Sequence, residues 1–250
     1  MSWNHIMGYV STAALFIPVA LIILLRMYNN KSLLALLVYY SIALVCNLMT
    51  ENIITPTASI VKFAGYSNNF LDAPLTLFYL LYFTRSQALR KKILYGIMGF
   101  IAFEVVAVAI LGINLQAITL VLGPGIVVIL SLSIRFFIQQ IEAVVQHGKS
   151  PGKALMIAST LFSYGGFLIL YLFFFVFKTN DTKNTFLVFY LVSTFASALL
   201  SAGLLFEKKR FRELAELKIA RKELSLLYPD EKPTVPKETA GSLEDEEELI

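Results

Sequence analysis

The sequence has little charge, one cysteine and few of the residues from which catalytic and metal sites are built. Of its 250 residues, 15% are charged and 57% are hydrophobic, whereas an average soluble domain is about 25% charged. Its two histidines lie outside the long apolar runs, which disfavours bis-histidine haem and His-based zinc sites. The lone cysteine, Cys46, has no partner for an internal disulfide. This composition argues against a water-soluble domain.

Familiar catalytic motifs are also missing. There is no G-x-S-x-G, no H-E-x-x-H and no glycine-rich phosphate loop. The net charge of +4 averages regions of opposite character and does not indicate nucleic acid binding. We therefore expect no cofactor, no metal and no nucleic acid partner, and the sequence does not favour an enzyme.

What the sequence has is seven long apolar runs. About 20 apolar residues cross the roughly 30 Å of hydrocarbon in a bilayer. The runs cover residues 7–28, 32–54, 66–85, 91–113, 116–141, 153–177 and 184–206. No basic residue precedes the first run, so we expect a retained helix rather than a cleaved signal peptide. The sequence predicts an all-α, polytopic membrane protein whose seven transmembrane helices form a bundle over residues 1–206.

The positions of lysine and arginine predict the orientation of this bundle. If the N-terminus lies outside, all but three of the 21 basic residues fall on the cytoplasmic side. The exceptions are Lys62, Lys178 and Lys183. Because cytoplasmic loops are enriched in Lys and Arg, we expect the N-terminus outside and the C-terminus in the cytoplasm, in a cell (inner) membrane.

Two further segments follow the seventh run. Residues 207–228 combine basic and acidic side chains with an apolar stripe, which predicts an amphipathic, basic cytoplasmic helix. This helix either lies on anionic lipid or continues straight out of the membrane towards a protein partner. Residues 229–250 contain proline and end in an acidic run, so we expect a disordered tail.

Polar side chains inside the apolar runs are the candidate site, because they are costly in hydrocarbon. A rise of about 1.5 Å per residue places most of them at one level, just outward of the midplane. The ligand-binding candidates are Asn47, Glu51, Asn68, Asp72, Glu104, Tyr164, Ser193 and Thr194. Two pairs, Asn47 with Glu51 and Asn68 with Asp72, are spaced four apart and share a helix face. Together they predict a polar pocket that opens outward.

The fifth run brings a proline to the same level. Pro124 frees a backbone carbonyl, and its neighbours Gly123 and Gly125 allow a bend, so we expect a helix break that acts as a hinge. The phenylalanines at 173–175 are expected to face lipid.

Each acid in the apolar runs also has a structural interpretation. Glu51 lies near the outer end of its run, where simple exposure would explain it. Asp72 is equally explained by a hydrogen bond to a neighbouring helix. Glu104 has apolar neighbours and suits a protonated contact between helices.

The helix count and orientation resemble those of rhodopsins and other seven-helix receptors. Retinal proteins of that kind bind the chromophore through a lysine in the last helix, but residues 190–197 here contain none, so the resemblance is topological. The seventh run continuing into a charged helix also resembles the membrane modules that precede bacterial sensor kinases. The sequence thus predicts a receptor-like sensor for a small ligand. A small-solute or proton-coupled transporter and a structural subunit of a membrane complex are the alternatives.

Overall fold

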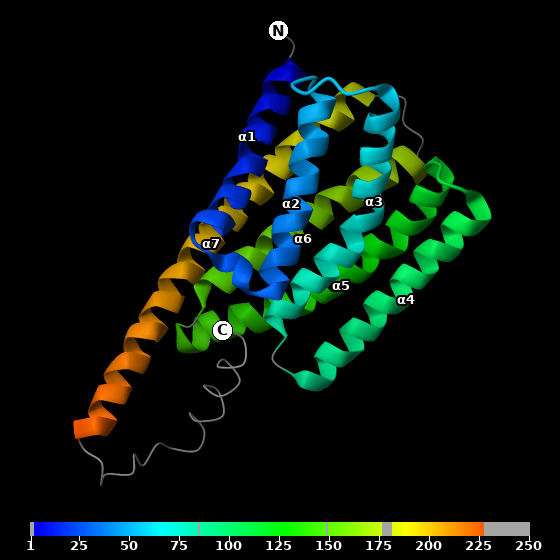
Figure 1. Ribbon diagram of the computed structural model, residues 1–250. Helices are drawn as coiled ribbons and strands as arrows, with labels where there is room; N and C mark the ends of the chain where they lie inside the picture. Colours follow the sequence, from blue (N-terminus) through cyan, green and yellow to red (C-terminus); the bar gives the residue numbers. More distant parts are fainter. Residues whose placement is uncertain (1–2, 85, 149, 177–181, 228–250) are drawn as a thin grey trace.

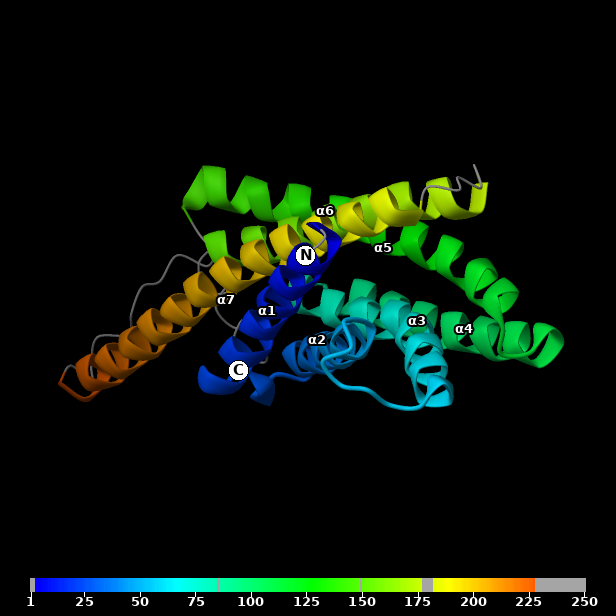
Figure 2. The ribbon, with the colours of Figure 1, turned by 90° about the horizontal axis from the view of Figure 1, so that it is seen from above.

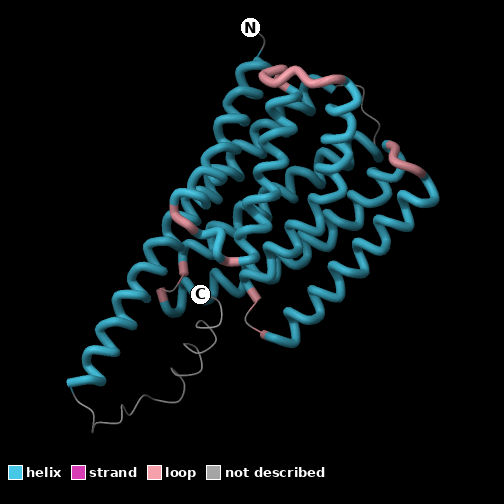
Figure 3. Tube along the Cα trace, in the orientation of Figure 1, coloured by secondary structure: helices cyan, strands magenta, loops and turns pink. Residues whose placement is uncertain are grey.

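The computed structural model describes residues 3–84, 86–148, 150–176 and 182–227, which form helices joined by short loops without any strand (Figures 1 and 3). The α-helices are α1 (Trp3–Leu24), α2 (Lys31–Thr50), α3 (Ala58–Leu80), α4 (Gln87–Leu111), α5 (Leu115–His147), α6 (Pro151–Tyr171) and α7 (Thr182–Leu227). Three short elements are η1 (Met27–Asn29), η2 (Leu81–Phe83) and the π-helix η3 (Leu172–Val176). Each predicted apolar run corresponds to one α-helix. The predicted tail over 229–250 lies outside the described residues.

Six of these helices are long and apolar enough to cross a membrane, which supports an integral membrane protein. The exception among the seven is α3, although its 23 residues would span the hydrocarbon. It is more polar than the others because it carries Lys62, Asn68, Asn69 and Asp72. It also begins at Ala58, so most of the segment that precedes the third apolar run belongs to the helix rather than to a loop.

Six helices form a closed ring. In order around it, α1 packs on α2, α2 on α3, α3 on α5, α5 on α6, α6 on α7, and α7 on α1. The remaining helix, α4, packs against α3 and α5 at the periphery, as the view from above shows (Figure 2). We call the end of the bundle near the N-terminus the upper end, and the end from which α7 projects the lower end (Figure 1).

Side chains at the lower end of α3 and in η2, which follows it, are deeply buried in the core. Residues 58–63 at the start of this helix are exposed, whereas Tyr79, Leu80 and Phe83 are almost completely buried. Phe83 packs against Phe136 of α5, with ring centroids 6.3 Å apart. Burial increases along α3 because its lower half is enclosed by neighbouring helices.

The longest helix, α7, has 46 residues, or about 69 Å at 1.5 Å per residue. Its upper part packs against α1 and α6, and its lower part projects from the bundle (Figure 1). The helix passes residue 207 without a break, so the predicted amphipathic segment begins as a continuation of the apolar one. Side chains from Arg212 onward are mostly exposed.

Candidate functional site

A cavity of about 400 Å³ lies inside the ring of six helices. All six ring helices contribute to its wall, together with η3, and α4 contributes nothing. Ligand pockets usually measure about 300–1,000 Å³, so this cavity is large enough for a small organic molecule.

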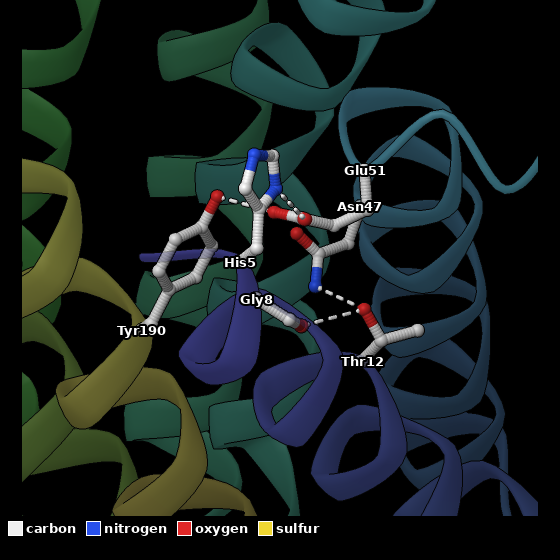
Figure 4. Close-up of polar contacts among 6 residues, drawn as sticks. All are labelled: His5, Gly8, Thr12, Asn47, Glu51 and Tyr190. Carbon is white, nitrogen blue, oxygen red and sulfur yellow. Dashed lines mark hydrogen bonds and ion pairs between the residues drawn. The ribbon is translucent and has the colours of Figure 1, made fainter. Parts of the chain in front are cut away.

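Four of the predicted site residues line this cavity: Asn47, Asn68, Asp72 and Ser193. They come from α2, α3 and α7, so residues distant in the chain meet at one level. Asn47 is also anchored, because its Nδ2 donates to Thr12 Oγ1 of α1 at 3.0 Å (Figure 4). The other three are spread over opposite sides of the ring and give the cavity polar groups on more than one wall.

Asp72 is buried, with 9% of its surface exposed. The Tyr164 hydroxyl lies 2.7 Å from Asp72 Oδ1 and 2.8 Å from Thr76 Oγ1. A phenol has one hydrogen, so it donates to the carboxylate and accepts from the threonine. Tyr39 of α2, on the cavity wall, interacts with the same carboxyl group. The acid therefore connects α2, α3 and α6, and Tyr164 supports the cavity from behind its wall.

Glu51 lies above the cavity and is buried rather than exposed, with 8% of its surface accessible. Tyr190 of α7 donates to Glu51 Oε1 at 2.6 Å, and His5 Nδ1 of α1 lies 3.7 Å from Oε2 (Figure 4). Gly8 makes room for this carboxylate, because a Cβ at that position would overlap it. Glu51 thus joins three helices at the upper end, and Tyr190 connects this cluster to the cavity wall.

Two predicted site residues lie away from the cavity. Glu104 is buried on α4, outside the ring, and its Oε1 has no hydrogen-bond partner among the described residues. It interacts electrostatically with Asp72. Thr194 bonds its own helix, donating to the Tyr190 carbonyl at 2.7 Å. The structure brings Glu104 towards Asp72 but not into the cavity.

The predicted hinge is not a break in the helix. Pro124 lies inside α5, which is α-helical from Leu115 to His147. The flanking glycines permit close packing: a Cβ at Gly123 would lie 2.7 Å from the Tyr171 hydroxyl, and one at Gly125 would lie 3.1 Å from Ala73 Cβ. A proline within a helix can be accommodated by such tertiary contacts.

The aromatic character of the cavity wall was not predicted from the sequence. Phe174 and Phe175, expected to face lipid, line the cavity where α6 continues as the π-helix η3. A π-helical turn holds more residues than an α-helical one and rotates the following side chains, so the simple helical face cannot be extended through it. The other aromatic lining residues are Tyr39, Tyr40, Phe167, Tyr171, Phe189 and Tyr190. Helical spacing offered a signal for some of them: Tyr40 precedes Asn47 by seven residues and Phe189 precedes Ser193 by four, so each pair shares a helix face.

A fourth buried acid, Glu207, was not predicted and lies at the lower end. Glu207 of α7 is fully buried; Tyr82 of η2 donates to its Oε1 at 2.7 Å, and Arg210 lies 3.2 Å from the same oxygen. Lys153 of α6 sits over the Tyr82 ring, 4.9 Å from its centroid. Glu207 opens the charged segment, where an acid usually belongs to a solvated surface, so only its packing reveals it.

The backbones of α6 and α7 are in close contact beside Glu207. A Cβ at Gly152 of α6 would lie 2.6 Å from the backbone nitrogen of Glu207 and 2.8 Å from the Gly203 carbonyl. On the opposite side of α7, Lys208 Nζ donates to the Leu25 carbonyl at the end of α1, at 3.0 Å. We call Tyr82, Gly152, Gly203, Glu207 and Lys208 the lower joint, because they hold α7 where it leaves the bundle.

The chemistry available at the cavity is hydrogen bonding, charge and aromatic contact. Within the described ranges, no three His, Cys, Asp or Glu side chains are grouped to hold a metal ion. Comparison with known proteins adds no further assignment: no family model matches the chain, and no curated protein or solved structure matches it.

Proposed function

We propose that this chain is a seven-helix, receptor-like membrane sensor that binds a small ligand in the ring cavity and reports through α7. In this proposal the upper end faces outward and the lower end faces the cytoplasm, as the distribution of lysine and arginine supports. The polar helix α3 is the seventh span. Its side chains Asn68, Asn69 and Asp72 line the ring cavity, which is how polar residues are tolerated at membrane depth.

One observation carries the proposal: the helix that forms part of the cavity wall is also the helix that leaves the bundle. Phe189, Tyr190, Ser193, Ala196 and Ser197 of α7 line the cavity. The same helix continues unbroken to Leu227. A ligand that favours one position of these wall residues would therefore favour one position of the projecting segment.

The physical mechanism is a shift between two arrangements of α7. A ligand shifts such an equilibrium only by as much as its affinity differs between the two arrangements. Contacts between the ligand and the α7 wall would supply that difference in affinity. The Tyr190–Glu51 bond holds α7 above the cavity, and the lower joint holds it below. Movement of α7 between these attachments would reach the cytoplasmic segment.

A cavity-filling substitution tests this coupling without knowledge of the ligand. Ala43 of α2 lines the cavity, so Ala43→Trp would occupy the space and press on the other wall residues, including those of α7. Spin labels at Val145→Cys and Ile219→Cys, both exposed positions, would report the distance between α5 and the α7 projection. The background needs one change, Cys46→Ser, because the chain has a single cysteine.

We expect Ala43→Trp to change the distance distribution between the two labels. The matched control is Val45→Trp on the same helix, because Val45 is exposed on the outside of the bundle and should leave the distribution unchanged. Identical distributions in both variants would contradict the proposal.

A second candidate, a small-solute or proton-coupled transporter, is favoured by Glu104. Its buried carboxyl lacks a hydrogen-bond partner among the described residues and interacts with Asp72. Two neighbouring acids in a membrane are a typical proton relay. A transporter would carry protons or solute across liposomes containing the purified protein, and Glu104→Gln would reduce that flux. A sensor would show no flux.

A further inference from the structure

The charge on the cavity wall is unbalanced. Asp72 is its one acidic residue, and no Lys, Arg or His side chain of the described chain lines the cavity. Nor does Asp72 take part in an ion pair with any described residue; its contacts are the hydroxyl groups of Tyr164 and Tyr39. A buried carboxylate needs a compensating charge or a proton.

The surroundings of Asp72 make a positive charge more favourable. Glu104 approaches from α4 and interacts electrostatically with Asp72, which adds negative potential on the side away from the cavity. Lys62, the described basic residue nearest to Asp72 in the sequence, lies near the start of α3 and is exposed. The missing positive charge would therefore come from the cavity.

The rest of the wall suits an apolar body attached to that charge. Phe167 and Phe189 stack with ring centroids 5.8 Å apart, and Tyr171 packs on Phe175 at 5.2 Å. All four line the cavity. Aromatic faces attract ammonium groups by cation–π interaction, and they also bury apolar groups.

We infer that the cavity binds a small organic cation, an amine or quaternary ammonium compound with an apolar body, and that Asp72 is its anionic anchor. This inference rests on the proposed function, because it names the ligand class of the same cavity. An anionic ligand is disfavoured because it would meet Asp72 without any Lys, Arg or His side chain of the described residues on the cavity wall. Asn47, Asn68 and Ser193 provide neutral polar contacts that position the ligand.

A series of phenyl compounds of similar size tests the charge preference. Binding of each to the purified full chain in nanodiscs would be measured by calorimetry. 2-Phenylethylamine carries a protonated amine and phenyltrimethylammonium a permanent charge, whereas 2-phenylethanol is neutral and 3-phenylpropionate is anionic. We expect both cations to bind at least tenfold more tightly than the alcohol, equivalent to about 1.4 kcal/mol, and the anion not to bind.

Two variants locate the anchor. Asp72→Asn should weaken both cations at least tenfold and leave the alcohol unchanged. Glu142→Gln replaces an exposed acid of α5 that does not line the cavity, and it should leave the affinity for all four compounds unchanged.

The inference is overturned if wild-type protein binds neither cation at millimolar concentration, if the alcohol binds as tightly as the cations, or if Asp72→Asn retains cation affinity. Equal affinity for the alcohol would mean that a proton neutralises Asp72. These outcomes are separate from the proposed function, which the spin-label distances test. Cation binding without coupling to α7 would preserve the ligand class and refute the sensor, and coupling with a neutral ligand would do the reverse.

Discussion

The upper half of the bundle is built around a cavity, whereas the lower half is built around direct contact between helices. Above, α1, α2 and α7 are joined by hydrogen bonds between side chains, such as the bond from Tyr190 to Glu51. Below, α6 and α7 meet backbone to backbone at Gly152 and Gly203. Each half buries an acid, but Asp72 borders an open space and Glu207 is enclosed on all sides.

This difference teaches which half can rearrange. Closely packed backbones have few alternative arrangements, while side chains around a cavity can change rotamer at little cost. We therefore expect substitutions in the lower half to affect stability, and substitutions in the upper half to affect ligand binding and the position of α7. Four changes test that comparison, ordered from the largest expected effect on stability to the smallest.

The largest effect is expected at the contact between α6 and α7. Gly152→Ala would place a methyl group against the backbone of Glu207 and Gly203, neither of which can move without shifting α7. We expect a loss of about 3 kcal/mol, the upper range for overpacking, measured as thermal unfolding of the purified protein in detergent. Gly165→Ala on the same helix is the control, because no atom lies within 4 Å of its Cβ position. Similar melting temperatures for the two variants would show that the lower half is not tightly constrained.

Removing the buried acid of the lower joint should have the next largest effect. Glu207→Ala leaves the Tyr82 hydroxyl buried without its acceptor, and we expect a cost of about 2 kcal/mol. Chemical denaturation of the detergent-solubilised protein would measure it. Glu213, also on α7, is an exposed acid that pairs with Lys209, and Glu213→Ala should change stability by less than about 0.5 kcal/mol. An equal effect of the two substitutions would contradict the assignment of Glu207 to the lower joint.

A smaller effect is expected behind the cavity wall. Tyr164→Phe removes the hydroxyl shared by Asp72 and Thr76, and should cost about 1 kcal/mol, because Asp72 borders the cavity and the two groups can adopt other rotamers. The same unfolding assay applies. Tyr171→Phe removes a longer bond, 3.2 Å to the Thr119 carbonyl, and serves as the milder comparison. If Tyr164→Phe lost as much stability as Gly152→Ala, the two halves would not differ in how tightly they are constrained.

The smallest effect on stability is expected at the upper end. Gly8→Ala would push the Glu51 carboxylate away from Tyr190, but a carboxylate at the end of a flexible side chain can move, so we expect a cost below about 1 kcal/mol. The fluorescence of Trp3, the single tryptophan, would report a local rearrangement on the same helix. Gly99→Ala, whose Cβ position has no neighbour, should leave both signals unchanged. A large loss of stability in Gly8→Ala would show that the upper cluster is as rigid as the lower joint.

Much of the fold could be predicted because each helix buries its own backbone hydrogen bonds and must cover about 30 Å of hydrocarbon. The seven apolar runs therefore correspond to seven helices, and α3 is one of them despite its polar residues. The number of transmembrane spans is less direct, since α3 is long enough but too polar to be recognised by composition. The expected break at Pro124 is absent, since α5 is helical on both sides of it. The sequence could not reveal the packing of other helices at the flanking glycines, such as that of Tyr171 at Gly123.

The candidate site was predictable in one dimension. Counting residues along a helix gives depth, and depth placed Asn47, Asp72 and Ser193 at a common level, where all three line the cavity. Rotation about the helix axis and position in the ring do not follow from depth. Glu104 lies at a similar level, yet its helix packs outside the ring and directs no residue into the cavity.

The amino acid sequence therefore determines that this chain forms apolar helices and at what level its polar residues lie, because both depend on local hydrogen bonding and transfer to hydrocarbon. Tertiary packing determines which side chains meet. It closes six helices into a ring, leaves α4 outside, turns Phe174 and Phe175 towards the cavity and buries Glu207 beneath it. These features arise from contacts between residues far apart in the chain, such as Tyr82 with Glu207, for which no local pattern exists.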